Sequence, residues 1–413
     1  MNKIPVMKPF FTQEEKDAIH DVLDSGWVAQ GPKVAEFERI IAAHEGVRHG
    51  IATTSCTTAL HLAMVALGLG EGMDVIAPSF TFVATVNSIR MTGATPLLAD
   101  IEQATFNINP EHVRQLINIY YVKKEDGLFH KQTGNRLWGI IAVHQFGLCA
   151  DMNRINKIAA EYNLMIIEDA ACAVGARIGS VYEGGFGHAS CLSFHPRKSI
   201  TTGEGGMILT NDDALAERLR TLRSHGASVS ADQRHTGQGF LLPEFNEIGF
   251  NYRMNDIQAA VGIAQAQKLD WLLEERNRRA SLYTYWIHEK IPFLIPPTVP
   301  EGYYHTYQSY VCMIDPKGLG INDIDALGDY RNKLLAGLEE LGISTRQGTH
   351  AVHMLGYYKE QYGYTPRDLP VSYTADRLSI TLPLYVQMTD EDQKAVITTI
   401  LKVASEINEM SER

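Results

Sequence analysis

Lys198 is the side chain in this 413-residue sequence whose surroundings best suit covalent chemistry. It lies in SFHPRKSITTGEGGMILTN (residues 193–211), after one apolar run and before a loop rich in threonine and glycine. Folds of the α/β class bind ligands at the carboxyl edge of their sheet, and burial there favours the neutral amine that forms a Schiff base. A solvated loop lysine is the commoner alternative, so Lys198 needs support from other residues.

Asp169 supplies that support. It ends the apolar run LMIIED, so its carboxylate emerges at the same edge of the sheet. Pyridoxal phosphate (PLP) withdraws electrons from a substrate while its ring nitrogen is protonated, and a nearby carboxylate keeps the proton there. Asp169 and Lys198 are about thirty residues apart, the span of one strand–helix–strand unit, so one cleft can hold both. Capping a following helix is the alternative role for Asp169, and the two roles are compatible.

A phosphate group needs a cradle, and the sequence offers one. Ser55, Cys56 and Thr57 close the apolar run GIATT and open the helical stretch TALHLAMVAL. Hydroxyls and free backbone N–H groups at a helix start bind anions, although ordinary helix capping is an equal alternative. Phe82, in PSFTFVAT, is able to stack on a pyridine ring, and a core aromatic is its alternative role. These residues together predict a PLP site.

Short apolar runs position these side chains. They are GIATT, DVIAP, PLLAD, GIIAV, LMIIE, SCLSF and GMILT, rich in Ile, Val and Leu without polar alternation, as in buried strands. Helical stretches such as residues 57–67 and Met152–Tyr162 lie between them. Strands that alternate with helices predict an α/β fold with a mostly parallel sheet covered on both faces.

The sequence also predicts a hairpin and several helices outside the candidate site. The polar run 123–134 suggests a surface hairpin or loop insertion. Residues 213–226 predict a helix that ends at a glycine C-cap, and charged helical sequence covers residues 264–290. A capping pattern at residues 389–392 begins the last predicted helix.

Composition excludes several classes of partner. The 37 Lys and Arg against 48 Asp and Glu give a net charge of −11, which attracts neither nucleic acid nor an anionic membrane. No apolar run has the length of a membrane span, and the first residues do not resemble a signal peptide. The five cysteines form no CxxC pair, so we expect reduced thiols, no metal site and a cytoplasmic location.

The chain resembles the DegT/StrS group of sugar aminotransferases, which are PLP enzymes of the aspartate-aminotransferase fold (fold type I). The motifs that carry the resemblance span nearly the whole chain: DSGWVAQGPKVAEFE, TSCTTALHLAMVALGLG, PSFTFVATVNSI, ATPLLADI, IIEDAACAVGA, SFHPRKSITTGEGG, FNYRMNDIQAA and LSITLPLY. This resemblance implies a three-layer fold around a seven-stranded, mostly parallel sheet. It also implies a large PLP-binding domain, residues 1–270, whose N-terminal segment borders the substrate entrance, and a smaller α+β C-terminal domain, residues 271–413.

The resemblance assigns roles to individual residues. Lys198 would form the internal Schiff base, Asp169 would contact the ring nitrogen, and Phe82 would stack on the ring. Asn251 matches an asparagine that reaches the phosphate from the neighbouring subunit, which implies a homodimer with shared sites. By position alone, Asn251 would be a loop residue before a helix capped by Asn255. The phosphate cradle would consist of Ser55, Cys56, Thr57 and Ser193.

Two positions depart from the family pattern. Cys56 stands where the family usually has glycine, and its backbone N–H remains able to bind phosphate. Cys172 stands where the family often has glutamine or histidine in contact with the phenolic oxygen of PLP. A thiol is a weaker hydrogen-bond donor, so we expect a weaker contact with the phenolic oxygen and an altered pKa of the Schiff base.

The resemblance implies substrate contacts at the entrance motif around Trp27, in the partner-subunit loop before Asn251 and in the segment TRQGTHAVH. His195, three residues before the lysine, is placed to serve in the same way. The segment TRQGTHAVH adds Arg346, which can pair with a carboxylate or phosphate, and His350 and His353, which can bind sugar hydroxyls. Structural histidines and a surface salt bridge are equally compatible with these residue types. The resemblance implies a nucleotide-activated 3- or 4-keto hexose as the amino acceptor.

The implied reaction has two stages. An amino donor, glutamate by resemblance, leaves its amino group on the cofactor as pyridoxamine phosphate, and the keto sugar then takes it, with Lys198 as the base that moves the proton. Such a reaction serves amino-sugar synthesis for surface polysaccharides or natural products. One alternative is a keto-sugar dehydratase of the same family, in which histidine replaces the lysine. Another is a regulatory protein that binds PLP without turnover.

Overall fold

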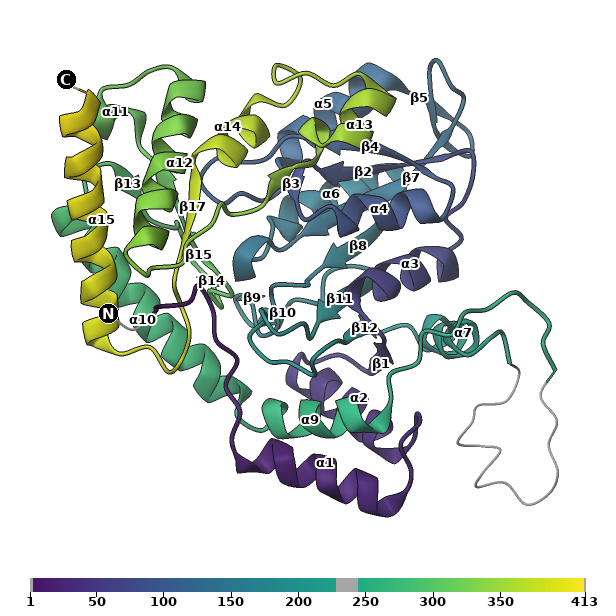
Figure 1. The fold of residues 1–413 in the computed structure, drawn as a ribbon. Helices are drawn as coiled ribbons and strands as arrows, with labels where there is room; N and C mark the ends of the chain where they lie inside the picture. Colours follow the sequence, from purple (N-terminus) through teal and green to yellow (C-terminus); the bar gives the residue numbers. More distant parts are fainter. Residues whose placement is uncertain (1–2, 228–243, 412–413) are drawn as a thin grey trace.

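The computed structural model describes residues 3–227 and 244–411 (Figure 1). Its central sheet runs in the order β1 (His49–Thr53), β12 (Gly206–Thr210), β11 (Ala189–Ser193), β8 (Met165–Asp169), β7 (Arg136–Val143), β2 (Met73–Pro78) and β4 (Thr95–Ala99). Neighbouring strands are parallel from β11 to β4, whereas β12 is antiparallel to both of its neighbours. The predicted mostly parallel sheet of fold type I is confirmed, and each predicted apolar run lies on one of these strands.

The polar run at residues 123–134 does form a hairpin, but the hairpin joins the sheet. Its strands are β5 (Tyr121–Lys124) and β6 (Gly127–His130), and β6 pairs with β7 through Phe129 and Arg136. Within the described residues the sheet therefore has nine strands, two more than the resemblance implies.

Both faces of the sheet are buried, because adjacent residues of one strand enter different core clusters. Ile208 packs with α3 (Cys56–Ala66) and α7 (Asp213–Arg223), whereas Leu209 packs with α2 (Pro32–His44) and α9 (Asp256–Ala266). Further along the sheet, α5 (Pro110–Tyr120) and α6 (Met152–Tyr162) cover β7 and β8. This arrangement gives the three layers, and α6 has the predicted bounds.

Three of the predicted helices can be compared in detail. The helix predicted over residues 213–226 ends at Arg223 instead, because the chain turns at Ser224 to pair with Asn251. Residues 264–290 are divided between the end of α9 and α10 (Leu269–Lys290). The cap at Thr389 is confirmed: its hydroxyl accepts from the N–H of Asp392 at 3.1 Å, at the start of α15 (Asp390–Ser411).

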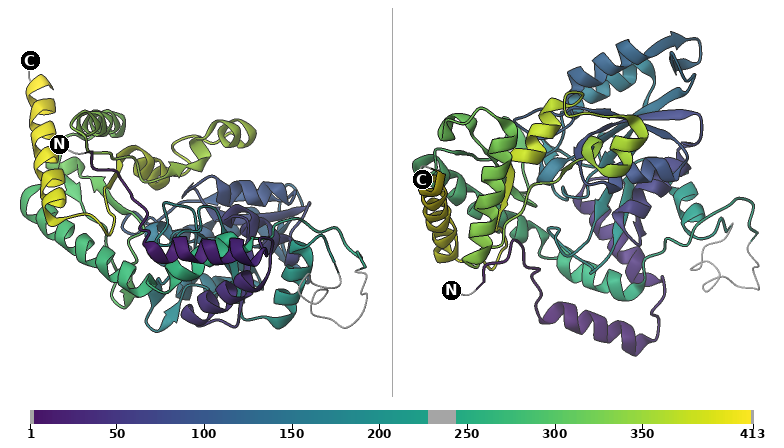
Figure 2. Two further views of the ribbon diagram at one scale, coloured as in Figure 1. Left: turned by 60° about the horizontal axis from the view of Figure 1, so that its bottom comes forward. Right: turned by 45° about the horizontal axis from the view of Figure 1, so that its top comes forward.

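The C-terminal part lies beside the large sheet, on the left in Figure 1. Its own sheet consists of β13 (Leu294–Ile295), β15 (Tyr310–Ile314) and β17 (Ser379–Leu382), with α12 (Ile324–Glu340), α14 (Pro370–Leu378) and α15 around it. Ile4 pairs with Ile343, so the N-terminal segment also begins against this part, and both marked termini lie there (Figure 2). The remaining elements are α1 (Gln13–Ser25), β3 (Phe80–Thr81), α4 (Ala84–Met91), η1 (Gln145–Gly147), β9 (Arg177–Ile178), β10 (Val181–Tyr182), β14 (Tyr303–Tyr304), α11 (Pro316–Leu319), β16 (His350–Ala351), η2 (Val352–Met354) and α13 (Gly356–Tyr362).

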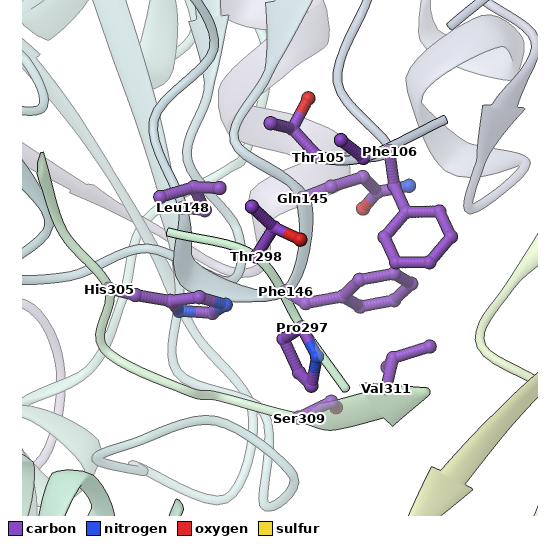
Figure 3. A pocket seen from close by; sticks show the side chains of 11 residues that line it. Thr105, Phe106, Gln145, Phe146, Leu148, Pro297, Thr298, His305, Ser309 and Val311 are labelled. Atoms are coloured by element: carbon purple, nitrogen blue, oxygen red, sulfur yellow. The ribbon is translucent and has the colours of Figure 1, made fainter. Parts of the chain in front are cut away.

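The junction between the two parts is aromatic. Phe80 and Phe146 of the large part each lie close to Phe106, at ring distances of 5.7 and 5.6 Å, and all three belong to the core cluster of the C-terminal part. Figure 3 shows the small hollow there, with His305 and Pro297 on its other side. None of the predicted site residues lines this hollow. The domain border at residue 270/271 falls at the start of α10 and stays a prediction. No helix in the described part of the chain combines the length and apolarity that a membrane span requires.

Candidate active site

The structure brings Lys198 and Asp169 to one edge of the sheet. Asp169 is the last residue of β8, and Lys198 follows β11, which runs parallel to β8 with Cys191 opposite Asp169. The Lys198 Nζ lies 3.1 Å from the Sγ of Cys172, in the turn after β8. The lysine side chain therefore returns across the end of β8, as a shared cleft requires.

The loop that carries Lys198 is held on two sides. Within the loop, the Lys198 N–H donates to the carbonyl of His195 at 2.8 Å. From the C-terminal part, the Gln308 side chain donates to the Arg197 carbonyl at 2.6 Å. The carbonyl of Gln308 in turn accepts from the buried Arg276 guanidinium at 2.6 Å. Sequence reasoning missed Gln308, and a pattern local to Lys198 contains no signal for it.

Asp169 is 4% exposed, and its carboxylate oxygens have separate donors. Thr85 Oγ1 donates to Oδ2 at 2.7 Å, and the Ala171 N–H donates to Oδ1 at 3.2 Å. Burial raises the pKa of Asp169, although these donors and the nearby Lys198 partly oppose that rise. The alternative role as a helix cap is wrong, because residues 170–176 form turns and no helix starts there.

The predicted phosphate cradle is assembled by strand register. Gly206 lies opposite Ser193 on one side and opposite Thr53 on the other, so the start of α3 comes beside the end of β11. Ser55 is the N-cap of α3, and its Oγ accepts from the Thr58 N–H at 3.2 Å. The first N–H groups of a helix have no partner within the helix, so they suit an anion.

Close packing at Gly206 supports the prediction of a phosphate cradle at the start of α3. A Cβ at Gly206 would lie 2.4 Å from the carbonyl carbon of Ser55 and 2.6 Å from the amide nitrogen of Cys56, closer than any side chain can come. The Cys56 thiol points away into the core and donates to the Cys191 carbonyl at 3.4 Å. Burial raises the pKa of this thiol, so it stays neutral and its backbone N–H is the group left for an anion. The residues present thus fit a phosphate.

Phe82 precedes α4 and is 65% exposed, which rules out the alternative of a core aromatic. Across the pair β3–β16, His350 lies opposite Thr81, the neighbour of Phe82. The structure therefore brings the predicted His350 close to the segment that carries the predicted stacking ring.

Basic groups surround Lys198. Burial lowers the pKa of Arg346, and the positive charge of Arg197 lowers it further. The Nε of Arg346 has no hydrogen-bond partner among the described residues. Burial also lowers the pKa of His195; the charge of Glu204 opposes this shift, and the charges of Arg197, Lys198 and Arg346 add to it. Arg197 and Arg346 thus bring two guanidinium groups near Lys198, which favours anionic ligands.

The remaining predicted residues differ in accessibility. Trp27 is 38% exposed, and its indole N–H donates to the Gln30 carbonyl at 3.3 Å. Asn251 is exposed on the strand-like segment that pairs with Ser224. His353 is fully buried with its Nδ1 2.7 Å from the Ser79 Oγ, and burial lowers its pKa to about 4. These contacts favour the structural-histidine alternative for His353 over a contact with the sugar.

Residues 9–401 match the family model of the DegT/DnrJ/EryC1/StrS aminotransferase family. The chain belongs to this family. The family is PLP-dependent, and the chain is accordingly a PLP-dependent sugar aminotransferase.

Individual proteins are similar to this chain over nearly their full length. The spore coat polysaccharide biosynthesis protein SpsC of Bacillus subtilis is 34% identical over 398 residues, which is 96% of each chain. A solved DegT/DnrJ/EryC1/StrS aminotransferase from Brucella abortus has a TM-score of 0.80 at 31% identity and covers 94% of this chain and 95% of its own. Helicobacter pylori PseC, an aminotransferase of pseudoaminic acid biosynthesis, has a TM-score of 0.85 at 25% identity and covers 98% of this chain and all of its own.

Proposed function

We propose that the protein transfers an amino group from glutamate to a nucleotide-activated 3- or 4-keto hexose, with Lys198 as the cofactor lysine. The contact of Lys198 with Cys172 at the end of β8, three residues beyond the buried Asp169, is the observation that carries the proposal. The similarity to SpsC and PseC supports a role in making amino sugars for surface polysaccharides.

Each residue has a defined task. Ser55, Ser193 and the first N–H groups of α3 would hold the phosphate, and Asp169 would contact the ring nitrogen. PLP, when bound, supplies the electron sink that weakens the bonds of the donor carbon. The amine of Lys198 would take the proton from that carbon and deliver it to the former aldehyde carbon of the cofactor, two bonds away, and the ring of Phe82 would hold the cofactor ring in a fixed plane.

The basic groups near Lys198 support an anionic substrate. Arg346 and His195 would meet the carboxylates of the donor or the phosphates of the nucleotide. His350 and Trp27 would contact the sugar from the entrance.

A homodimer with shared sites is part of the proposal. Asn251 is exposed, and the same segment carries Phe245 at 60% and Ile248 at 89% exposure, so it presents apolar surface for a second copy. Mixing the variants Lys198→Ala and Asn251→Ala tests this arrangement, because mixed dimers would contain one intact site. Recovery of activity on mixing at limiting PLP is expected, and no recovery would contradict shared sites.

Incubation of the PLP-loaded protein with glutamate tests the reaction. We expect the absorbance of the Schiff base to convert to that of pyridoxamine phosphate, and a panel of nucleotide keto sugars should reverse it. Lys198→Ala should bind PLP without this conversion. If the wild-type protein binds PLP and glutamate changes nothing, the regulatory alternative holds instead.

A further inference from the structure

Thr85, on the first turn of α4, is buried against the carboxylate of Asp169. Its Oγ1 is 2.7 Å from Asp169 Oδ2 and 2.9 Å from the hydroxyl of Thr81, and both threonines are 1% exposed. The contact with Asp169 spans 84 positions in the sequence and joins β8 to the segment that follows β2.

The direction of these hydrogen bonds follows from the proton count. A carboxylate only accepts, so the single hydroxyl hydrogen of Thr85 is donated to Asp169, and the hydroxyl of Thr81 must then donate to Thr85. The second oxygen of Asp169 accepts from the N–H of Ala171. Each carboxylate oxygen thus has a fixed donor, which fixes the plane of the group.

The hydrogen bond from Thr85 also favours the charged form of Asp169. A carboxylate that is 4% exposed is desolvated, and donors to its oxygens are what keep it ionised in such a place. A neutral carboxylic acid could not hold a proton on the ring nitrogen of a cofactor, because it would carry that proton itself.

We propose that Thr85 is a positioning residue of the aminotransferase: its hydroxyl orients Asp169 and keeps it ionised, so that the proton stays on the ring nitrogen of PLP. The inference rests on the proposed role of Asp169. A purely structural role, in which Thr85 fastens α4 to β8, predicts lower stability without any change at the ring nitrogen.

The test uses Thr85→Val, which keeps the shape of the side chain and removes the donor, with Thr85→Ser as the matched control. The holoenzyme is loaded with PLP labelled with ¹⁵N in the ring, and the ring nitrogen is observed by NMR. In Thr85→Val we expect its signal to move toward the unprotonated position. We also expect the single-turnover rate with glutamate to fall by roughly 10- to 100-fold at unchanged glutamate affinity, the effect of one hydrogen bond to a charged group. Thr85→Ser should behave as the wild type does.

A ring nitrogen that stays protonated in Thr85→Val would overturn the inference. If Thr85→Val does not fold, Thr85→Ala serves in its place, because alanine is favourable in a helix, and the same signal decides. Asp169→Asn separates the inference from the proposed function. Loss of the proton in Asp169→Asn with no loss in Thr85→Val rejects the role of Thr85 alone, whereas retention in Asp169→Asn rejects the role of Asp169 itself.

Discussion

Replacement of Gly206 by alanine is expected to damage the phosphate cradle more than the rest of the cofactor site. The new Cβ would lie 2.4 Å from the Ser55 carbonyl carbon and 2.6 Å from the Cys56 nitrogen. These are backbone atoms, so no side-chain rotation relieves the overlap. The start of α3 must retreat from β12 by about 1 Å to restore ordinary van der Waals contact.

A retreat of that size exceeds the tolerance of a hydrogen bond to a phosphate oxygen. A hydrogen bond to a charged group contributes about 1.5–3 kcal/mol. The loss of one such bond from the first turn of α3 should weaken PLP binding by roughly 10- to 100-fold.

Titration of the apoprotein with PLP and, separately, with pyridoxal measures this effect through the absorbance of the Schiff base. We expect Gly206→Ala to bind PLP more weakly and to bind pyridoxal, which has no phosphate, as the wild type does. Gly70→Ala is the matched control, because its Cβ would meet no heavy atom within 4 Å. Equal weakening of both ligands would indicate a general distortion, and unchanged binding of both would place the phosphate elsewhere. Either result refutes the reasoning.

Three further predictions follow from contacts in and around the site. Cys172→Gln should shift the pH titration of the Schiff-base absorbance, and an unchanged curve would mean that this side chain does not reach the phenolic oxygen. Gln308→Ala removes the donor 2.6 Å from the Arg197 carbonyl and should slow Schiff-base formation by about 5- to 10-fold, the effect of one neutral hydrogen bond. Gln387→Ala, which removes a similar bond to the Pro9 carbonyl, should leave that rate unchanged. Burial lowers the pKa of His353 to about 4, so the unfolded chain takes up the proton first and stability falls as the pH drops from 6.5 toward 4. Urea titrations measure the free energy of unfolding at each pH. Between pH 7 and pH 5 this free energy should fall by about 2 kcal/mol less in His353→Asn than in the wild type, and an equal fall in both proteins would contradict the prediction.

The sequence predicts the parts of the fold that depend on local patterns. Buried strands leave continuous apolar runs, and α6 shows its helical period from Met152 to Tyr162, so both could be predicted. Asp169 could be predicted because it ends such a run, and the carboxyl ends of parallel strands form the edge of the sheet where ligands bind. The early end of α7 could not be predicted, because it depends on the pairing of Ser224 with Asn251, a distant segment.

The residues that support the site are less visible in the sequence. Thr85 acts on Asp169 from 84 positions away, and Gln308 acts on Arg197 from 111 positions away. Threonine and glutamine have many uses in a protein, so their type alone indicates no partner. Likewise, nothing in the segment TRQGTHAVH distinguishes the exposed His350 from the buried His353.

The buried guanidinium of Arg276 has a consequence for movement. It is 2% exposed and donates to the carbonyls of Tyr307 and Gln308, and Tyr307 adopts a left-handed backbone with φ 47°. Because Arg276 and Gln308 both belong to the C-terminal part, a displacement of that part would move them together and break the hydrogen bond from Gln308 to the Arg197 carbonyl, which holds the loop of Lys198. The position of the C-terminal part relative to the large sheet is therefore coupled to the geometry of the lysine loop.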